Sequence, residues 1–364
     1  MLSPALHQSP LHERHITAGA KMAEFGGWAM PVEYVGAGVL AEHAAVRGAV
    51  GMFDVSHLGK VLVAGPGALD HLNRRLTNDL SALAAGKAQY HLLCNEQGGV
   101  VDDLIAYVVS PDRVLLIPNA ANASTVAGLL KQDAPAGVHL TDLHHDRAVI
   151  AVQGPRSDEV LSAIGLPVDL DYMSFQELDP STTICRTGYT GERGCELVVP
   201  ADAAEEWWDR LAEAGAPFGV QFCGLGARDT LRTEMGYALH GHELSPSIDP
   251  VSAGVSWAIG WDKPEFDGKD ALAAIRAAGP PRRSRGILAS GRGIPRPGME
   301  VLDADEQPIG VVTSGTFSPS LRTGIGLALV DAGHLPGTPV GVRVRQRIEA
   351  FDLVKAPFVD SHVR

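Results

Sequence analysis

The 364-residue sequence lacks the features of several common protein classes. Its four cysteines include no CxxC pair, so neither a disulfide framework nor a paired-cysteine zinc site is predicted. No stretch approaches the roughly 20 apolar residues that a membrane helix needs. The first residues include His7, His12 and His15 and lack the apolar core of a signal peptide. We therefore expect reduced thiols, no membrane segment and a cytoplasmic location.

Basic residues are in the minority. Lys and Arg number 30 against 43 Asp and Glu, which gives a formal net charge of −13. Proteins that bind nucleic acid generally need a positive surface, so nucleic acid is not an expected partner. Arginines do gather at 282–285 and at 343–347. A solvated surface explains each cluster, and a docking patch for an acidic partner is the alternative.

Sequence motifs of several enzyme classes are also missing. There is no GxSxG, no GxxxxGK[ST] and no GxGxxG after a strand-like run. The 14 histidines are scattered without the spacing of metal ligands. The sequence therefore gives no support for a hydrolase triad, a kinase, a dinucleotide-dependent enzyme or a metal site.

The organisation of the chain predicts an α+β protein with a separate C-terminal part. Two similar patterns begin at Val61 and at Val149, and each reads as strand, Gly-Pro turn, helix, further strands and a second helix. We therefore predict a domain at 1–278 built of two related α+β units. Beyond Gly279, short β-like runs separated by Gly and Pro predict a small β-barrel or sandwich at 283–364.

The second helix of the second pattern is the clearest one. Asp202 is predicted to be its N-cap, and Gly215 its end. Trp207 and Trp208 lie with other apolar residues at helical spacing, so core packing is their predicted role.

Residues 186–196, with the sequence RTGYTGERGCE, carry more chemistry than an ordinary hairpin needs. Glycine lets a backbone approach a ligand closely. Tyr189 offers an apolar ring with a polar tip. The carboxylate of Glu196 stands at the start of an apolar run and needs a donor. This segment predicts the rim of a pocket for a flat, nitrogen-rich ligand.

Two further segments are candidates for a site. The strand predicted after Gly99 carries Asp102 and Asp103 on opposite faces, so one can serve a pocket while the other caps a turn. The alternative, slightly favoured by the local pattern, is that both only end a hairpin. Arg228 and Arg232 lie one turn apart on a predicted helix and suit a carboxylate-bearing ligand, although their spacing alone favours a ladder of surface ion pairs.

Taken in order, these segments resemble the aminomethyltransferases of the glycine cleavage system, the T-protein family. The resemblance runs nearly from end to end. The matching segments are 25–31 (FGGWAMP), 51–57 (GMFDVSH), 98–104 (GGVVDDL), 186–192 (RTGYTGE), 224–229 (GLGARD), 313–319 (TSGTFSP) and 355–359 (KAPFV).

The resemblance implies a cloverleaf-like fold of three subdomains with tetrahydrofolate in a central hole. It implies transfer of an aminomethyl carbon from the lipoyl arm of the H-protein to tetrahydrofolate, without a metal. The products are 5,10-methylenetetrahydrofolate, ammonia and the dihydrolipoyl H-protein. Residue by residue, Asp103 matches the catalytic aspartate of the family, and Glu196 matches the carboxylate that binds the pterin. The other positions that match the folate pocket are Tyr90, Asn119, Tyr172, Tyr189, Arg228 and Trp257.

Two other folate-binding roles fit part of the pattern. A folate-coupled demethylase usually carries a fused flavin domain, for which this chain has no fingerprint. A folate-binding accessory protein for iron–sulfur or tRNA-modification chemistry carries a Lys-Gly-Cys-type segment, where this chain has RTGYTGE. Cys195 departs from the family, which has bulkier apolar residues there, and predicts a looser and more oxidation-sensitive strand. Docking of the lipoylated H-protein needs a local positive surface, for which the arginines at 282–296 or at 343–347 are candidates.

Overall fold

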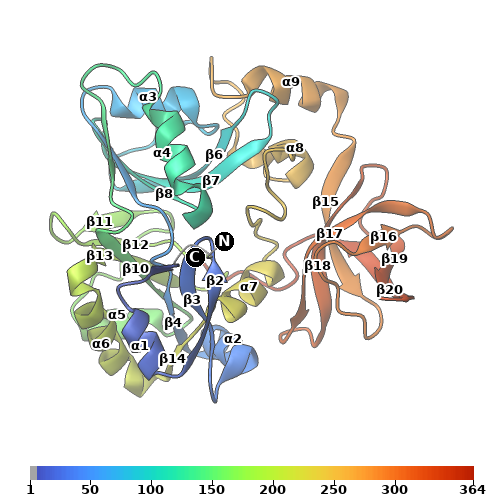
Figure 1. Ribbon diagram of the computed structural model, residues 1–364, viewed down its shortest axis with the longest axis horizontal. Helices are drawn as coiled ribbons and strands as arrows, with labels where there is room; N and C mark the ends of the chain where they lie inside the picture. The colour runs from blue at the N-terminus through green and yellow to red at the C-terminus, as the bar shows by residue number, and fades with distance from the viewer. Residues whose placement is uncertain (1–5) are drawn as a thin grey trace, which may run out of the picture.

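The computed structural model describes residues 6–364. Three bodies meet around the centre of the molecule: two α+β units lie one above the other, and a β-barrel lies beside them (Figure 1). A small N-terminal sheet of order β1-β3-β2 precedes them. The elements of this N-terminal part are β1 (His7–Gln8), α1 (His12–Thr17), β2 (Ala20–Phe25), β3 (Trp28–Tyr34), α2 (Gly38–Gly48) and β4 (Val50–Asp54).

The first unit is a five-stranded sheet of order β6-β7-β8-β5-β9. Its outward face packs on α3 and α4 through a core that includes Leu72, Leu104 and Val126. The elements are β5 (Val61–Ala64), α3 (Ala68–Arg75), β6 (Lys87–Cys94), β7 (Val100–Ser110), β8 (Arg113–Pro118), α4 (Ala123–Lys131) and β9 (His139–Asp142).

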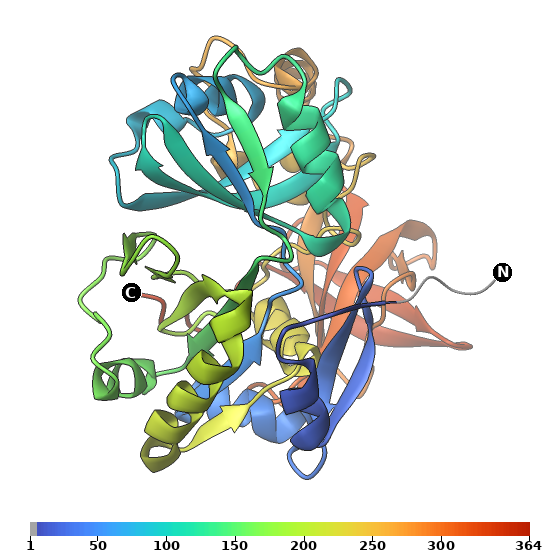
Figure 2. The ribbon, with the colours of Figure 1, turned by 60° about the vertical axis from the view of Figure 1, so that its left-hand side comes forward.

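The second unit repeats this order of elements, as the sequence pattern predicts. Its sheet has the order β11-β12-β13-β10-β4-β14, so β4 is inserted next to β10. The elements are β10 (Arg147–Gln153), α5 (Ser157–Ala163), β11 (Phe175–Glu177), β12 (Thr183–Cys185), β13 (Gly194–Pro200), α6 (Ala204–Gly215) and β14 (Val220–Phe222). Helices α5 and α6 cover the outward face of this sheet (Figure 2).

The inward faces of the two sheets share a third core with α7. Tyr107 of the first unit and Val198 of the second belong to the same buried cluster as Leu231. Strand alternation therefore decides which side chains can reach the interior between the units. The helices after the second unit are α7 (Leu225–Glu234), α8 (Pro250–Ala253) and α9 (Lys269–Ala278). Short 3₁₀ turns lie at 80–82, 120–122, 201–203, 216–218 and 256–258.

The C-terminal part is a closed barrel of order β15-β18-β17-β16-β19-β20, which confirms the predicted α+β fold class with a C-terminal barrel. Its last strand is missing from the sequence prediction, because only Phe351 and Leu353 of that strand are buried. Its strands are β15 (Arg282–Ala289), β16 (Glu300–Leu302), β17 (Pro308–Ser318), β18 (Thr323–Asp331), β19 (Pro339–Val344) and β20 (Arg347–Val354).

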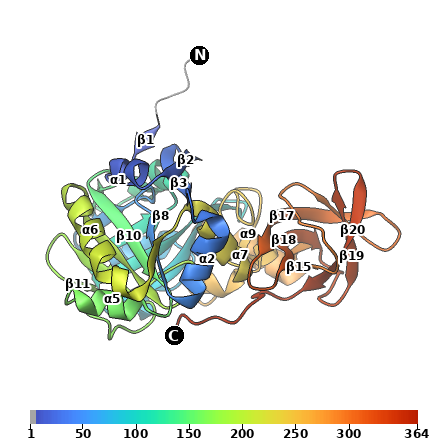
Figure 3. The same ribbon diagram turned by 90° about the horizontal axis from the view of Figure 1, so that it is seen from below.

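After the barrel, the chain returns beneath the second unit, where it ends (Figure 3). The Phe358 amide donates to the carbonyl of Glu234 at 2.8 Å, and the Arg186 guanidinium donates to the carbonyl of Val363 at 2.7 Å. The tail therefore ties the barrel to the loop that follows β12.

Two local predictions are wrong. Helix α6 begins at Ala204 with Ala203 as its N-cap, and no side chain caps it. Asp202 lies in the 3₁₀ turn that leads into the helix, so its carboxylate does not cover the free amides. Cys195 is not loosely packed, because it is 1% exposed within the outer core of the second unit. Burial raises the pKa of its thiol to about 12, which opposes oxidation through the thiolate.

Candidate functional site

A cavity of about 1330 Å³ lies where the two units, α7 and the barrel meet. All eight residues that the resemblance assigns to a folate pocket line it, from both units, from α7 and from the segment after α8. They are Tyr90, Asp103, Asn119, Tyr172, Tyr189, Glu196, Arg228 and Trp257. Residues more than 150 positions apart in the sequence, such as Tyr90 and Trp257, thus line the same cavity.

Asp103 reaches the cavity because β7 alternates. Leu104 faces the outer core of the first unit, whereas Asp103 points to the inward side. Its Oδ2 accepts a hydrogen bond from the Tyr90 hydroxyl at 2.9 Å, and its Oδ1 accepts one from the Asn119 amide at 2.8 Å. Burial raises the pKa of Asp103, while the Tyr90 hydroxyl opposes that rise by donating to the ionised form.

Tyr90 and Asn119 come from the strands on either side of Asp103. Tyr90 lies on β6, and Asn119 directly follows β8, whose Pro118 lies opposite Leu104. The Tyr90 ring stacks on Trp257 with centroids 5.2 Å apart and planes 29° apart. Trp257 is 66% exposed, so it forms part of the rim of the cavity. An aromatic pair of this kind can cover one face of a flat ligand.

Glu196 reaches the cavity from the second unit by the same alternation. Its neighbours Cys195 and Leu197 belong to the outer core. Glu196 accepts a hydrogen bond from the Thr187 hydroxyl at 2.6 Å. The Tyr107 hydroxyl lies 3.0 Å from the same Thr187 oxygen. The carboxylate is thereby held in place with its remaining lone pairs free to accept hydrogen bonds from a ligand.

The loop before Glu196 folds tightly onto Gln153 of β10. The Gln153 amide donates to the carbonyl of Thr187 at 3.2 Å and accepts from the Thr190 hydroxyl at 2.8 Å. A Cβ at Gly188 would lie 2.0 Å from the Gln153 side-chain oxygen, so any other residue there would displace the Gln153 amide from its hydrogen bonds. This packing sets the position of Tyr189 between the two glycines of the loop.

Tyr189 joins the loop to α7 and to the segment after it. Its hydroxyl donates to the carbonyl of Ala238, and its ring stacks on Tyr237 with centroids 5.6 Å apart. The Arg228 guanidinium lies 4.7 Å from the centroid of the Tyr189 ring. Tyr172 completes this wall and is partly buried.

Arg228 and Arg232 have different environments although they are one turn apart. Arg232 pairs with Asp229 at 2.6 Å and with Glu243 at 3.1 Å, so it does form ion pairs, but it is buried rather than part of a surface ladder. Arg228 has no such ion pair, and its Nη1 is buried without a hydrogen-bond partner among residues 6–364. Burial lowers the pKa of Arg228, and the nearby Glu196 opposes that effect. Arg228 is partly buried, so a guanidinium on the cavity wall that makes no ion pair among the described residues is suited to bind an anionic group.

The cavity also contains residues that the sequence reasoning missed. His57, which follows β4, lines it, and burial lowers the pKa of its imidazole to about 3, so the ring is neutral at pH 7. Arg285 and Lys355 bring the barrel into the wall. His57 lies in a segment that carries the family resemblance, which is the one signal that pointed to it. Lys355 lies in another such segment, 355–359, and Arg285 belongs to the arginine cluster at 282–285, but no sequence pattern predicted that either would reach the cavity, because their approach depends on how the domains pack.

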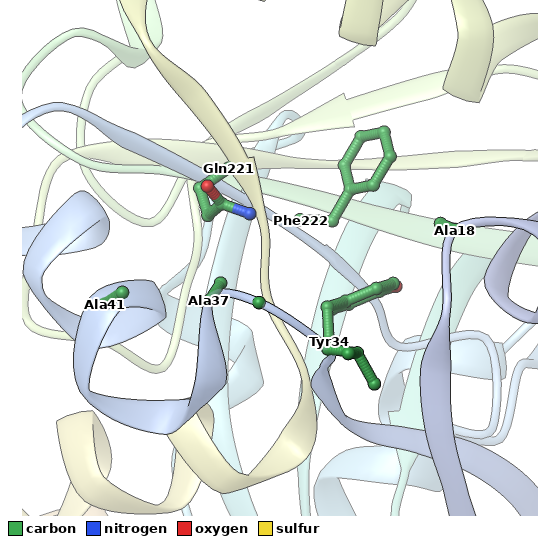
Figure 4. Close-up of a pocket in the computed structure, with 8 residues that line it drawn as sticks. Ala18, Tyr34, Ala37, Ala41, Gln221 and Phe222 are labelled. Atoms are coloured by element: carbon green, nitrogen blue, oxygen red, sulfur yellow. The ribbon is translucent and has the colours of Figure 1, made fainter.

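A second, smaller hollow of about 420 Å³ lies between β3, the start of α2 and β14. Tyr34 and Phe222 lie on one side of it, and Gln221 and Ala37 lie on the other (Figure 4). None of the eight predicted residues lies there, and its lining contains no charged side chain. The central cavity is therefore the better candidate for chemistry.

Within residues 6–364, no group of three or more His, Cys, Asp or Glu side chains is arranged to hold a metal ion. No helix in that range is long and apolar enough to cross a membrane.

A family model for the GCVT N-terminal domain matches residues 11–263, and one for the glycine cleavage T-protein C-terminal barrel domain matches residues 282–360. The chain belongs to the glycine cleavage T-protein family. It is 57% identical over 362 residues to an aminomethyltransferase of Parafrankia sp. (strain EAN1pec), and this alignment covers 99% of each chain. The aminomethyltransferase of Mycobacterium tuberculosis (strain ATCC 25618 / H37Rv) is 54% identical over 366 residues, also with 99% of each chain covered.

Among solved structures, the glycine cleavage system aminomethyltransferase T from Bartonella henselae superposes with a TM-score of 0.94 at 35% identity. The superposition covers 98% of this chain and 99% of that one. The T-protein resemblance and the fold that it implies are thus confirmed for the whole chain.

Proposed function

We propose that this T-protein family member transfers the aminomethyl carbon from the lipoyl arm of the H-protein to tetrahydrofolate. The products are 5,10-methylenetetrahydrofolate, ammonia and the dihydrolipoyl H-protein. The observation that carries the proposal is the cavity itself, in which Asp103 and Glu196 face inward from opposing sheets together with Arg228, which makes no ion pair among residues 6–364. The names of the curated relatives agree with this activity.

The second unit would bind the folate. Glu196 has lone pairs free to accept the parallel N–H groups at the edge of a pterin ring. Tyr172 and Tyr189 would flank the ring from their own unit, and the Tyr90–Trp257 stack would flank it from the other side. Arg228 would attract a carboxylate of the glutamate tail, because its charge lacks an ion-pair partner among the described residues.

The first unit would act on the reacting carbon. Loss of ammonia from the aminomethyl thioether leaves a cationic carbon, which the folate N5 attacks before ring closure at N10. The protons that N5 and N10 lose are balanced by those gained by the departing ammonia and by the released thiol. A carboxylate held by Tyr90 and Asn119, as Asp103 is, would stabilise the positive charge and orient N5.

The partner must deliver its lipoyl arm into the cavity. We propose that the acidic H-protein docks at Arg282, Arg283 and Arg285, because Arg285 also lines the cavity. The other cluster is less suited, since it lies at the β19–β20 hairpin, on the far side of the barrel from the two units (Figure 3). Charge reversal of Arg282, Arg283 and Arg285 should raise the KM for the H-protein. An unchanged KM would exclude this patch.

We also propose that the chain acts in the cytoplasm.

We further propose that the chain divides into domains at 1–278 and 283–364. Helix α9 ends at Ala278 and β15 begins at Arg282, which leaves a short connection between them. Limited proteolysis with mass spectrometry should cut between 278 and 283 before it cuts inside either part. A first cut inside either part would contradict this division.

The activity is tested by supplying tetrahydrofolate and aminomethyl-loaded H-protein to the purified protein and measuring 5,10-methylenetetrahydrofolate. We expect product in proportion to enzyme and none with unloaded H-protein. Binding of tetrahydrofolate without any product would instead support the accessory role.

A further inference from the structure

We propose that Asp102, the neighbour of the catalytic Asp103, is a positioning residue for the reaction. It holds the Asn119 amide against the Asp103 carboxylate, and it is itself held by a relay that begins at His240. This inference rests on the proposed aminomethyl transfer. Asp102 does not line the cavity, and the local sequence pattern slightly favoured a role for it at the end of a hairpin.

Asp102 is fully buried and lies on the opposite face of β7 from Asp103. Its Oδ2 accepts the backbone N–H of Asn119 at 3.0 Å. Its Oδ1 accepts the side-chain amides of Asn119 at 2.9 Å and of Asn122 at 2.7 Å. Burial and the charge of Asp103 raise the pKa of Asp102 to about 7. The N–H groups of Asn119 and Asn122 oppose this rise, because N–H donors stabilise the ionised carboxylate.

The Asn119 side chain bridges the two carboxylates. The same Nδ2 that donates to Asp102 lies 2.8 Å from Oδ1 of Asp103 and 3.0 Å from the carbonyl of that residue. If this amide turned over, its oxygen would face both carboxylates and be repelled by each. Asp102 therefore fixes the orientation in which Asn119 donates to Asp103.

The far end of the relay has a fixed direction as well. His240 Nε2 lies 3.2 Å from the carbonyl of Val100, which can only accept, so this nitrogen carries the hydrogen. The other ring nitrogen, Nδ1, then accepts from the Asn122 amide at 3.0 Å. Asn122 thus donates one amide hydrogen to His240 and the other to Asp102. The direction of donation is thus set from the histidine to Asp102, and the two hydrogens of the Asn119 amide are shared among Asp102 Oδ1, Asp103 Oδ1 and the Asp103 carbonyl.

The relay affects both the geometry and the electrostatics of Asp103. Its carboxylate is held at one oxygen by Asn119 and at the other by Tyr90. The titratable groups that face it are Asp102 on its own strand, Tyr90 on β6, Tyr189 in the loop before β13 and His240 in the segment after α7. Removing the charge of Asp102 should make Asp103 easier to ionise, and adding a carboxylate at the end of the relay should have the opposite effect.

Two isosteric substitutions test this prediction, and neither changes a residue of the cavity wall. Asp102→Asn removes one charge, and Asn122→Asp adds one beside Asp102. We would measure kcat as a function of pH with saturating substrates, tetrahydrofolate affinity by fluorescence titration, and the Tm. Asp305→Asn, an exposed change in a loop of the barrel, is the matched control.

We expect kcat to fall by about 10- to 100-fold in both relay variants, because a small displacement of a catalytic group has effects of that size. The acid limb of the pH profile should move to lower pH in Asp102→Asn and to higher pH in Asn122→Asp, by about one pH unit in each case. Tetrahydrofolate affinity should change less than threefold, and Asp305→Asn should match the wild type.

A merely structural role would lower the Tm and the folate affinity of both variants and leave the acid limb of kcat unmoved, and this result would overturn the proposal. A shift in the same direction in both variants would overturn it too. Failure of the proposed function is distinguishable, because the wild type and Asp305→Asn would then also give no product while still binding folate.

Discussion

The two α+β units have the same order of elements, yet they bring different chemistry to the cavity. Each sends one carboxylate inward by strand alternation, Asp103 from β7 and Glu196 from β13. Asp103 is held by two donors and adjoins a second buried carboxylate, whereas Glu196 is held by one hydroxyl and keeps its other lone pairs free. Two units of similar fold can thus have different roles, with the first unit suited to catalysis and the second to binding.

The largest effect should come from the first unit. Asp103→Asn removes the charge that would stabilise the cationic carbon, so kcat should fall by about 100- to 1000-fold. Tetrahydrofolate affinity should stay within about threefold, because an amide can still occupy the position between Tyr90 and Asn119. Stopped-flow measurement of product under single-turnover conditions checks the rate. A variant as active as the wild type would remove Asp103 from its role and break the comparison between the units.

The two arginines of α7 should separate stability from binding. Arg232→Leu leaves the buried Glu243 without its ion-pair partner, so the free energy of unfolding should fall by about 3–5 kcal/mol. Arg228→Leu removes a partly buried charge that makes no ion pair among the described residues, so its unfolding free energy should stay within about 1 kcal/mol of the wild type or rise. Urea unfolding measures both. Equal destabilisation of the two variants would show that Arg228 has a structural role.

Glu196→Gln tests the binding role of the second unit. The amide keeps the shape of the side chain but places a donor where the pterin edge also donates. The Kd for tetrahydrofolate should therefore rise by about 10- to 100-fold, while kcat at saturation changes much less. Fluorescence titration and steady-state kinetics give the two values. A fall in kcat with an unchanged Kd would reverse the roles of the units.

The smallest expected effect is on the stability of the protein at acidic pH, and it comes from Glu234, which does not line the cavity. The His43 and Arg47 partners of Glu234 hold its pKa at about 2, well below its ordinary value of 4.5. Because the folded state binds the proton more weakly, this group adds stability above pH 4.5 and loses that contribution as the pH falls towards 2. Urea unfolding between pH 6 and pH 2.5 should show a smaller pH dependence in Glu234→Gln than in the wild type. An equal dependence would exclude this contribution.

That the eight predicted residues would lie together was inferred from the family resemblance, and all eight do line the central cavity. Spacing alone did not suffice, since it favoured a hairpin end for Asp102 and Asp103 and an ion-pair ladder for both arginines. The pairing of β7 with β8 brings Asn119 to both carboxylates, and this contact depends on sheet register rather than on local pattern. The roles of Arg285 and Lys355 in the wall depend on the packing of the barrel, which no local signal encodes.

The most direct test of the central claim is a crystal structure of the protein with tetrahydrofolate. We predict that the pterin ring lies in the central cavity, with its N–H edge on Glu196, its ring beside the Tyr90–Trp257 stack and N5 facing Asp103. A folate bound in the smaller hollow lined by Tyr34 and Phe222, or in the central cavity with its pterin away from both carboxylates, would contradict the account.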